Sequence, residues 1–191
     1  MKLQTQAKYL ARPADSPPRR DVPFFSQNII YDTHNEGGIM NKNLREKVRM
    51  SDAEIDEFVE EQKSLQVATL NSDGSIHLST LWFAVVDQKI AFETYTSSQK
   101  IVNLKRDSRI TVLLEDGLEY NNLRGVMIKG TALLTEESAE VEKIAREVIK
   151  RNQPEIPEEM LDDAAASLAR KRTVVTIVPE KTVSWDHGKI S

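Results

Sequence analysis

The spacing of apolar residues changes several times along the chain and predicts short helices alternating with strands. Ser51–Glu54 has the pattern of a helix-capping box, and the apolar residues after it follow at helical spacing to about Lys63. From Val67 to Thr94 the period falls to two, with turn sequences at Asn71–Gly74 and Asp87–Gln88. This part of the sequence therefore predicts one helix followed by an antiparallel meander.

The middle strand of that meander, Ile76–Val86, is apolar on both of its faces. A strand with one face in water would alternate more cleanly between apolar and polar residues. One face can fill a core, and the other then needs a helix or a second subunit to cover it. We therefore expect a homodimer.

The rest of the chain repeats this mixture of strands and helices. A short helix is expected after a cap at Ser97 or Ser98, with Ile101, Val102 and Leu104 facing inward. Further strands are predicted at Ile110–Glu115, Arg124–Leu134, Thr173–Val178 and Thr182–Trp185, and helices at Glu136–Lys150 and about Glu158–Arg170. About six strands joined mainly by hairpins predict a mainly β (α+β) fold, a closed or partly closed antiparallel barrel with peripheral helices.

Composition narrows the class of protein. The chain of 191 residues contains no cysteine and carries a net charge of −4, which argues against disulfides, thiolate chemistry and general nucleic-acid binding. Residues 1–39 hold four of the seven prolines and read as an extended or disordered leader before a domain over 40–191, although a natural start at Met40 is an alternative. No apolar run is long enough for a membrane span and no secretory signal is present, so we expect a cytoplasmic protein.

The strongest local signal for chemistry is Thr94–Lys100, where a strand end, four hydroxyls and a lysine meet the start of a helix. The free N–H groups of a helix start attract anions, and Lys100 adds a full charge. The stretch also opens a basic island, Ser98–Arg109, with a net charge of +3. Two interpretations stay open. The stretch is either a phosphate site or a pair of helix caps beside a solvated lysine, and spacing alone favours the second.

Other candidate motifs are weaker. Two glycines within Arg124–Gly130 indicate either close approach of a ligand or a bulge that helps a barrel turn. The three histidines, His34, His77 and His187, are too far apart in sequence to indicate a metal site, and we expect none. Because no acid–base pair stands out and no catalytic residue can be named, any redox chemistry would be carried by a bound cofactor.

These features occur in an order that is similar to a known family. The resembling stretches are Met50–Ile55, Ala68–Leu70 with Asp73–Gly74, Leu81–Phe83, Phe92–Thr94, Ser98–Asp107 with Arg109, Glu115–Gly117, Tyr120, Leu123–Val126, Lys129–Gly130 and Val183–His187. Together they resemble the pyridoxamine-5'-phosphate-oxidase-like, FMN-binding split-barrel superfamily, and within it the F420H2-dependent oxidoreductases called the B class. Ser108 replaces a proline usual in that group, and the leader has no counterpart.

The resemblance implies a homodimeric, six-stranded antiparallel split β-barrel with a cofactor between its subunits. It implies that Lys100 holds the cofactor phosphate, in a site formed with Thr94, Ser97, Ser98, Asn103 and Arg106. It further implies that the ring lies along Ser79, Thr80, Leu81 and Trp82, and that the acidic tail of the deazaflavin F420 faces Arg124 and Lys129.

The activity implied is hydride transfer from reduced F420 to a small unsaturated or conjugated acceptor. Two alternatives keep the fold: an FMN-dependent oxidase or reductase, and a non-catalytic flavin or haem-type carrier. The expected partners are a small-molecule substrate and a second copy of the chain, with neither nucleic acid nor membrane.

Overall fold

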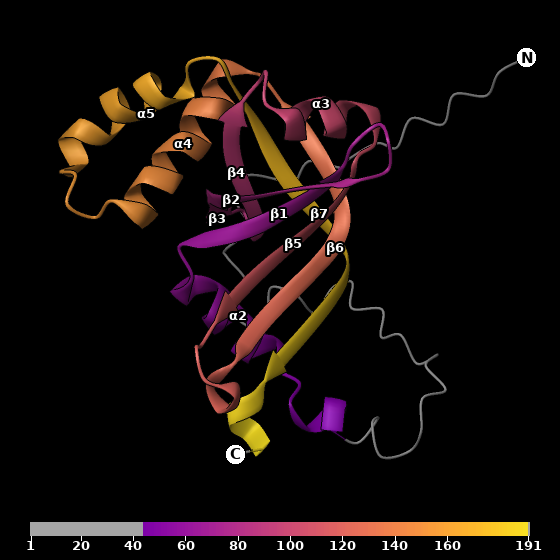
Figure 1. Cartoon of the computed structure of the whole chain (residues 1–191). Helices are drawn as coiled ribbons and strands as arrows, with labels where there is room; N and C mark the ends of the chain where they lie inside the picture. Colours follow the sequence, from indigo (N-terminus) through magenta and orange to yellow (C-terminus); the bar gives the residue numbers. More distant parts are fainter. Residues whose placement is uncertain (1–43, 191) are drawn as a thin grey trace, which may run out of the picture.

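The computed structural model describes residues 44–190, so the predicted leader over 1–39 lies outside the described residues. Its helices are α2 (Asp52–Glu61), α3 (Gln99–Arg106), α4 (Ser138–Asn152) and α5 (Leu161–Ala169), with 3-10 turns η1 (Tyr120–Asn122), η2 (Glu158–Met160) and η3 (His187–Ile190). Its strands are β1 (Ser64–Leu70), β2 (Ile76–Trp82), β3 (Ala84–Val86), β4 (Lys89–Tyr95), β5 (Arg109–Asp116), β6 (Arg124–Thr135) and β7 (Arg172–Asp186). Figure 1 shows α3, α4 and α5 at one end of the curled sheet and α2 nearer the other.

The strand order shows how the barrel closes. The order is β2-β1-β5-β6-β7-β4-β3, and every pairing is antiparallel. The strands at the two ends of this order, β2 and β3, are consecutive in the chain and separated only by Phe83. The expected six-stranded α+β barrel is therefore confirmed, with β2 and β3 as two halves of one stretch.

Three details differ from the sequence-based expectation. The single strand predicted over Ile76–Val86 is broken at Phe83, because its two halves pair with different partners, β1 and β4. The two strands predicted at the end of the chain form one strand, β7, whose only irregularity is a bulge beside Pro179. Val102 was expected to face inward but is 51% exposed, because Ile101 and Leu104 occupy the buried face of α3.

The bulge explains one of the two glycines noted in the sequence. The register of β6 and β7 shifts between Lys129 and Gly130, and Gly130 lies opposite Pro179. A Cβ atom at Gly130 would lie 2.0 Å from the carbonyl oxygen of Val178. Gly130 therefore permits a close backbone approach at a barrel bulge, as the simpler interpretation held.

Helix α2 begins as its sequence predicts. The Ser51 N–H donates to Glu54 Oε2 at 2.6 Å and the Glu54 N–H donates to Ser51 Oγ, which forms both halves of the capping box. Its carboxyl end is satisfied from a distance, because the Arg151 guanidinium of α4 donates to the carbonyl oxygens of Val59, Glu60 and Gln62. The α2 carbonyls thus need no local cap.

The same end of α4 fixes the break between β2 and β3. The Arg151 guanidinium lies 4.7 Å from the centre of the Phe83 ring, and Asn152 Nδ2 donates to the Phe83 carbonyl at 3.4 Å. Phe83 itself is fully buried in the main apolar core. The position at which the strand changes partners is therefore held by packing and by a hydrogen bond.

Within residues 44–190, no helix has the length and apolar character to span a membrane.

Candidate functional site

The predicted phosphate site lies where β4 runs into α3. Lys100 is buried although it carries an ammonium group, and within residues 44–190 its Nζ makes one long hydrogen bond, 3.4 Å, to Thr94 Oγ1. An ammonium has three donors, so most of its capacity is unused. Thr94 shares the core side of β4 with fully buried Phe92, which places this pair on the inner face of the sheet.

Ser98 adds a second unused polar group at this place. It is the N-cap residue of α3, yet its side chain makes no capping hydrogen bond, and its buried Oγ has no partner in the part of the chain that the structure describes. The first backbone bonds of α3 run from Ile101 and Val102 to the Ser98 carbonyl, so the helix supplies no acceptor to the N–H groups of Gln99 and Lys100. We call Lys100, Thr94 and Ser98 the α3 seat. Its buried donors match the needs of an anion.

The electrostatics of the seat point the same way. The pKa of Lys100 lies below its ordinary value of 10.5, first because burial disfavours the charged form and second because Arg172 repels it. A bound anion would offset both effects. The charged lysine is therefore held at a cost that a phosphate would remove.

A depression in the surface lies where the barrel splits, and the residues that line it do not include those of the α3 seat. Strand β4 pairs with β7 over Ala91–Tyr95 but with β3 only over Lys89–Ala91, and β2 pairs only with β1 among the described residues. Among the described residues, one edge of β2 and one edge of the last part of β4 therefore have no strand paired with them. A groove of about 1060 Å³ lies there, and it is walled by the α4–α5 hairpin. It is lined by Ser64, Thr80, Leu81, Trp82, Glu93, Tyr95, Ile149, Gln153, Ala164, Ser167, Leu168, Arg170, Lys171 and Arg172.

Arg172 is one of several groove residues that were not predicted from the sequence. Its Nη1 donates to Glu93 Oε2 at 2.8 Å, and its guanidinium lies 3.9 Å from the centre of the Tyr95 ring. Its Nε is buried and has no partner among the described residues. The pKa of Glu93 is raised because burial outweighs the attraction of Arg172. No local sequence signal marks Arg172, since both contacts depend on the pairing of β4 with β7.

Other residues predicted near the phosphate are used by the fold or exposed. Asn103 is fully buried, and its Nδ2 donates to Thr69 Oγ1 at 3.0 Å and to Asn71 Oδ1 at 2.9 Å, which ties α3 to β1. Arg106 donates to the carbonyl of Leu70, and Ser97 is exposed. The structure brings all three to the same end of the barrel as Lys100, but Asn103 and Arg106 already have protein partners.

The β2 residues predicted to lie along the ring divide between two faces. Leu81 and Ser79 pair with the fully buried Leu65 and Val67, so they point into the barrel. There Ser79 Oγ is buried, with no partner from residues 44–190. Thr80 and Trp82 point outward, and Trp82 is 49% exposed. Thr80, Leu81 and Trp82 all line the groove.

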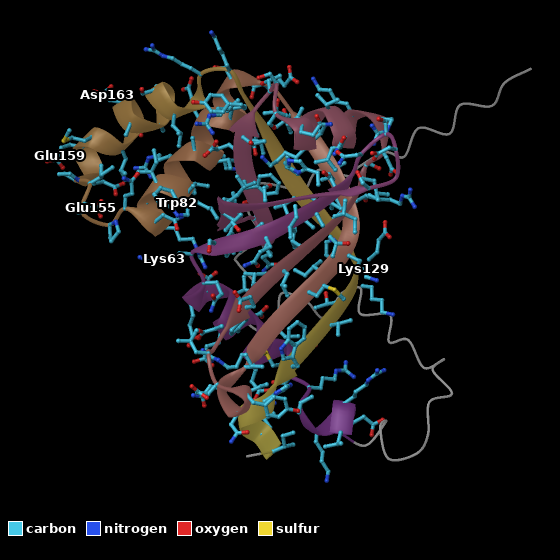
Figure 2. All side chains as sticks on the ribbon, viewed as in Figure 1. Lys63, Trp82, Lys129, Glu155, Glu159 and Asp163 are labelled. Carbon is cyan, nitrogen blue, oxygen red and sulfur yellow. The ribbon has the colours of Figure 1, made fainter. Side chains whose placement is uncertain are left out.

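Arg124 and Lys129 are not brought to the groove within one chain. Arg124 lies at the far end of the β5–β6 ladder from α3 and forms ion pairs with Glu61 and Asp116. Lys129 is exposed, and Figure 2 places it on the opposite flank of the barrel from Trp82. A role for either in ligand binding stays a prediction.

Comparisons with known proteins agree with the fold. A protein-family profile described as pyridoxamine 5'-phosphate oxidase matches residues 51–186. The conserved hypothetical protein Rv2991 of Mycobacterium tuberculosis is 40% identical, with a TM-score of 0.72 over 76% of this chain and 91% of that chain. A comparison with curated proteins finds no match.

Two more distant structures share the fold. The haem storage protein HutZ of Vibrio cholerae is 17% identical, with a TM-score of 0.56 over 71% of this chain and 96% of that chain. A FAD-binding protein of Mesorhizobium loti is 14% identical, with a TM-score of 0.54 over 71% and 94%. At these identities the likeness concerns the fold alone.

Proposed function

Because the chain belongs to the pyridoxamine 5'-phosphate oxidase family, we propose that it is an F420H2-dependent oxidoreductase that passes a hydride from a bound deazaflavin to a small unsaturated or conjugated acceptor. The observation that carries this proposal is the α3 seat, where the described residues offer a buried ammonium one long hydrogen bond and a buried hydroxyl none. A coenzyme phosphate would supply the missing acceptors.

The groove supports the choice of a large, anionic coenzyme. It begins at Trp82 and Tyr95, whose exposed rings offer flat apolar surface. It continues along Arg170, Lys171 and Arg172, and the one carboxylate among its lining residues, Glu93, is paired with Arg172, so the groove keeps a net positive charge in addition to Lys100. FMN carries one phosphate, whereas F420 carries a phosphate and a tail of carboxylates, so the surplus charge favours F420 over FMN.

The residues of this chain need to bind, orient and exclude water. When bound, the reduced coenzyme supplies the hydride, and the protein need not supply a nucleophile. Lys100, Thr94 and Ser98 would hold the phosphate, and Thr80, Leu81 and Trp82 would lie beside the ring. The α4–α5 hairpin would form the wall that limits access of water.

We also propose that the active form is a homodimer. The outward face of β2 carries Ile76, Leu78 and Trp82, of which Leu78 is 66% exposed. Their neighbours in the ladder, Ala68 of β1 and Leu113 of β5, continue this face as partly exposed apolar positions. Exposed apolar side chains on one sheet face are typical of an interface, although Gln66, Thr80 and Thr111 lie among them here. A second copy placed on this face would lie next to Trp82 at the lip of the groove.

A titration with F420 and with FMN tests the proposal, followed by the absorbance of the reduced coenzyme in the presence of candidate acceptors. The expected result is tighter binding of F420 and acceptor-dependent oxidation of F420H2. Exclusive binding of FMN would favour the FMN-dependent alternative. Tight binding of coenzyme or haem without turnover of any acceptor would favour a carrier, and binding of neither coenzyme would refute the proposal.

A further inference from the structure

Four apolar side chains are exposed at the end of the barrel that lies opposite to the α4–α5 hairpin. Leu118 is 99% exposed, Tyr120 67%, Leu44 50% and Ile190 38%. They come from three segments that are far apart in sequence: the start of the described chain, the turn between β5 and β6, and η3. Figure 1 shows the first described turn and the C terminus at this end of the barrel. We call these four residues the η1–η3 patch.

Hydrogen bonds hold the three segments against one another. The Asp186 N–H donates to the Val48 carbonyl at 2.6 Å, which joins the chain start to the end of β7. The His187 N–H donates to the Leu123 carbonyl at 3.0 Å, and the His187 and Tyr120 rings lie 4.6 Å apart between centres, which joins η3 to the β5–β6 turn. The exposed apolar side chains of the three segments therefore belong to one surface.

The turn that carries Leu118 has a defined conformation. Gly117 has a φ of 98°, and a Cβ atom there would lie 2.1 Å from the Asn122 carbonyl oxygen. The Asn122 N–H donates to the Glu119 carbonyl at 2.8 Å and closes the turn. Single exposed apolar residues need no explanation, but a group of them on one surface is typical of a docking site.

A segment suited to cover this patch is residues 19–31, which lie outside the described residues. It contains two arginines and then five large apolar residues: Arg19 and Arg20, then Phe24, Phe25, Ile29, Ile30 and Tyr31. Segments that stay solvated are poor in aromatic residues, whereas three of these thirteen residues are aromatic, against 6% in the whole chain. The other three of the five phenylalanines, Phe58, Phe83 and Phe92, are each at most 2% exposed. The composition of the segment therefore favours burial.

The position of the segment in the chain favours this surface. Tyr31 precedes Leu44 of the patch by thirteen positions, and thirteen residues reach at most about 45 Å. Strand β7, which runs along the barrel, has 15 residues and therefore a length of about 50 Å. The end of the segment at Tyr31 is thus tethered near the patch, at a high local concentration.

Charge favours the same pairing. Residues 1–43 hold six basic and four acidic residues, which leaves a net charge of −6 on the rest of the chain. On either side of Leu118 in the sequence, Glu115 and Glu119 are exposed and form no ion pair within residues 44–190. Arg19 and Arg20 can supply the missing positive charge.

We propose that residues 19–31 dock on the η1–η3 patch of their own chain. The two phenylalanines of the segment contact Leu118 and Tyr120, and its two arginines lie beside Glu115 and Glu119. The inference goes beyond the proposed function, because it concerns a surface that binds no coenzyme.

The lack of native cysteine allows a disulfide test in the full chain. Ser26→Cys with Asn121→Cys places a thiol on the segment and a thiol beside the patch, and both substitutions leave the named contacts intact. Docking brings the two thiols within reach of each other, so mild oxidation should close a disulfide within one chain. Non-reducing gel electrophoresis and the intact mass measure its rate of formation.

Three matched variants show whether closure depends on docking. Adding Phe24→Ser and Phe25→Ser to the cysteine pair keeps the tether length and should slow closure about tenfold, the scale of partial burial of two phenylalanines. Adding Tyr9→Ser and Leu10→Ser instead should leave the rate unchanged. Moving the second cysteine from Asn121 to Glu159, which Figure 2 shows on the α4–α5 hairpin, should also slow closure about tenfold.

The charge of the segment is tested in the same cysteine pair. Arg19→Glu with Arg20→Glu should slow closure about two- to tenfold, the scale of two exposed charge pairs. Lys2→Glu with Lys8→Glu makes the same change of charge outside the segment and should have no effect.

Equal rates with and without the two phenylalanines would overturn the inference, and so would equal rates for Asn121 and Glu159, because the segment would then meet the surface at random. A disulfide that joins two chains would overturn it as well, since the segment would then cover the patch of another molecule. None of these measurements contains a coenzyme, so their outcome is independent of the proposed function.

Discussion

Replacing Lys100 with methionine separates the effect of the buried ammonium on the stability of the fold from its effect on coenzyme binding. Methionine has a similar length and removes the charge, so it should relieve the desolvation that depresses the pKa of Lys100. The substitution gives up only one long hydrogen bond, 3.4 Å to Thr94. We therefore expect the free energy of unfolding to stay within about 1 kcal/mol of wild type.

Coenzyme binding should respond in the opposite way. A charge-assisted hydrogen bond to phosphate contributes about 1.5–3 kcal/mol, so Lys100→Met should weaken FMN and F420 about 10- to 150-fold. Both coenzymes should be affected, because both carry the phosphate. Fluorescence titration measures the affinity, and urea denaturation measures the stability of the same preparations.

The control is Lys105→Met on the same helix. Lys105 is half-exposed and forms an ion pair with Glu136, so the same change of charge is made outside the seat. It should cost less than about 1 kcal/mol of stability and leave coenzyme affinity unchanged. The reasoning is refuted if Lys100→Met binds coenzyme like wild type, or if it loses several kcal/mol of stability.

Further outcomes follow from other parts of the structure. The stability of wild type relative to Lys100→Met should rise with pH up to about 10.5, because Lys100 binds its proton more tightly in the unfolded chain than in the folded one. A difference in unfolding free energy that stays constant in denaturation experiments across alkaline pH would contradict this. The hydrogen bonds of Glu54 to Lys189 and Ser51 lower its pKa to about 2, so above pH 4.5 the ionised Glu54 should make wild type more stable than Glu54→Gln. This difference in the free energy of unfolding should vanish as the pH falls to about 2, which denaturation measured at a series of acidic pH values will check. Leu78→Lys should yield monomers in light scattering, while Leu118→Lys, at a 99% exposed leucine, should not; an unchanged dimer in both would remove the β2 face as the interface. Gly130→Ala should destabilise the chain by about 3 kcal/mol or more because its Cβ meets a backbone carbonyl, whereas Gly74→Ala, strained but open, should cost about 1 kcal/mol; equal melting temperatures would refute the role of the bulge.

Local patterns allowed much of this fold to be predicted. The capping box at Ser51 and Glu54 is a short-range device, so its two hydrogen bonds could be expected from four residues of sequence. The strand register likewise follows from alternation and tight turns. The break at Phe83 could not be expected, because apolar residues continue on both sides of it and the change of partner depends on distant strands.

The candidate site also has one part that is local in sequence and one part that depends on distant strands. The seat at Lys100 lies within one strand-to-helix junction, and the residues that form it are close in sequence. The groove is assembled from β2, β4, β7 and the α4–α5 hairpin, and Arg172 contacts Glu93 across 79 positions of sequence. In the sequence Arg172 is an ordinary basic residue after a helix, and its importance arises only from the ladder that pairs β4 with β7.

The contacts of Arg151 have a consequence for how a ligand enters. One guanidinium closes the end of α2 and stacks on Phe83, from which the lip of the groove extends toward Trp82. Swinging that lip outward would uncover the α2 carbonyls and separate the cation from the ring at the same time. We therefore expect this side of the groove to move little when a molecule arrives, so that little of the binding free energy is spent on ordering the protein.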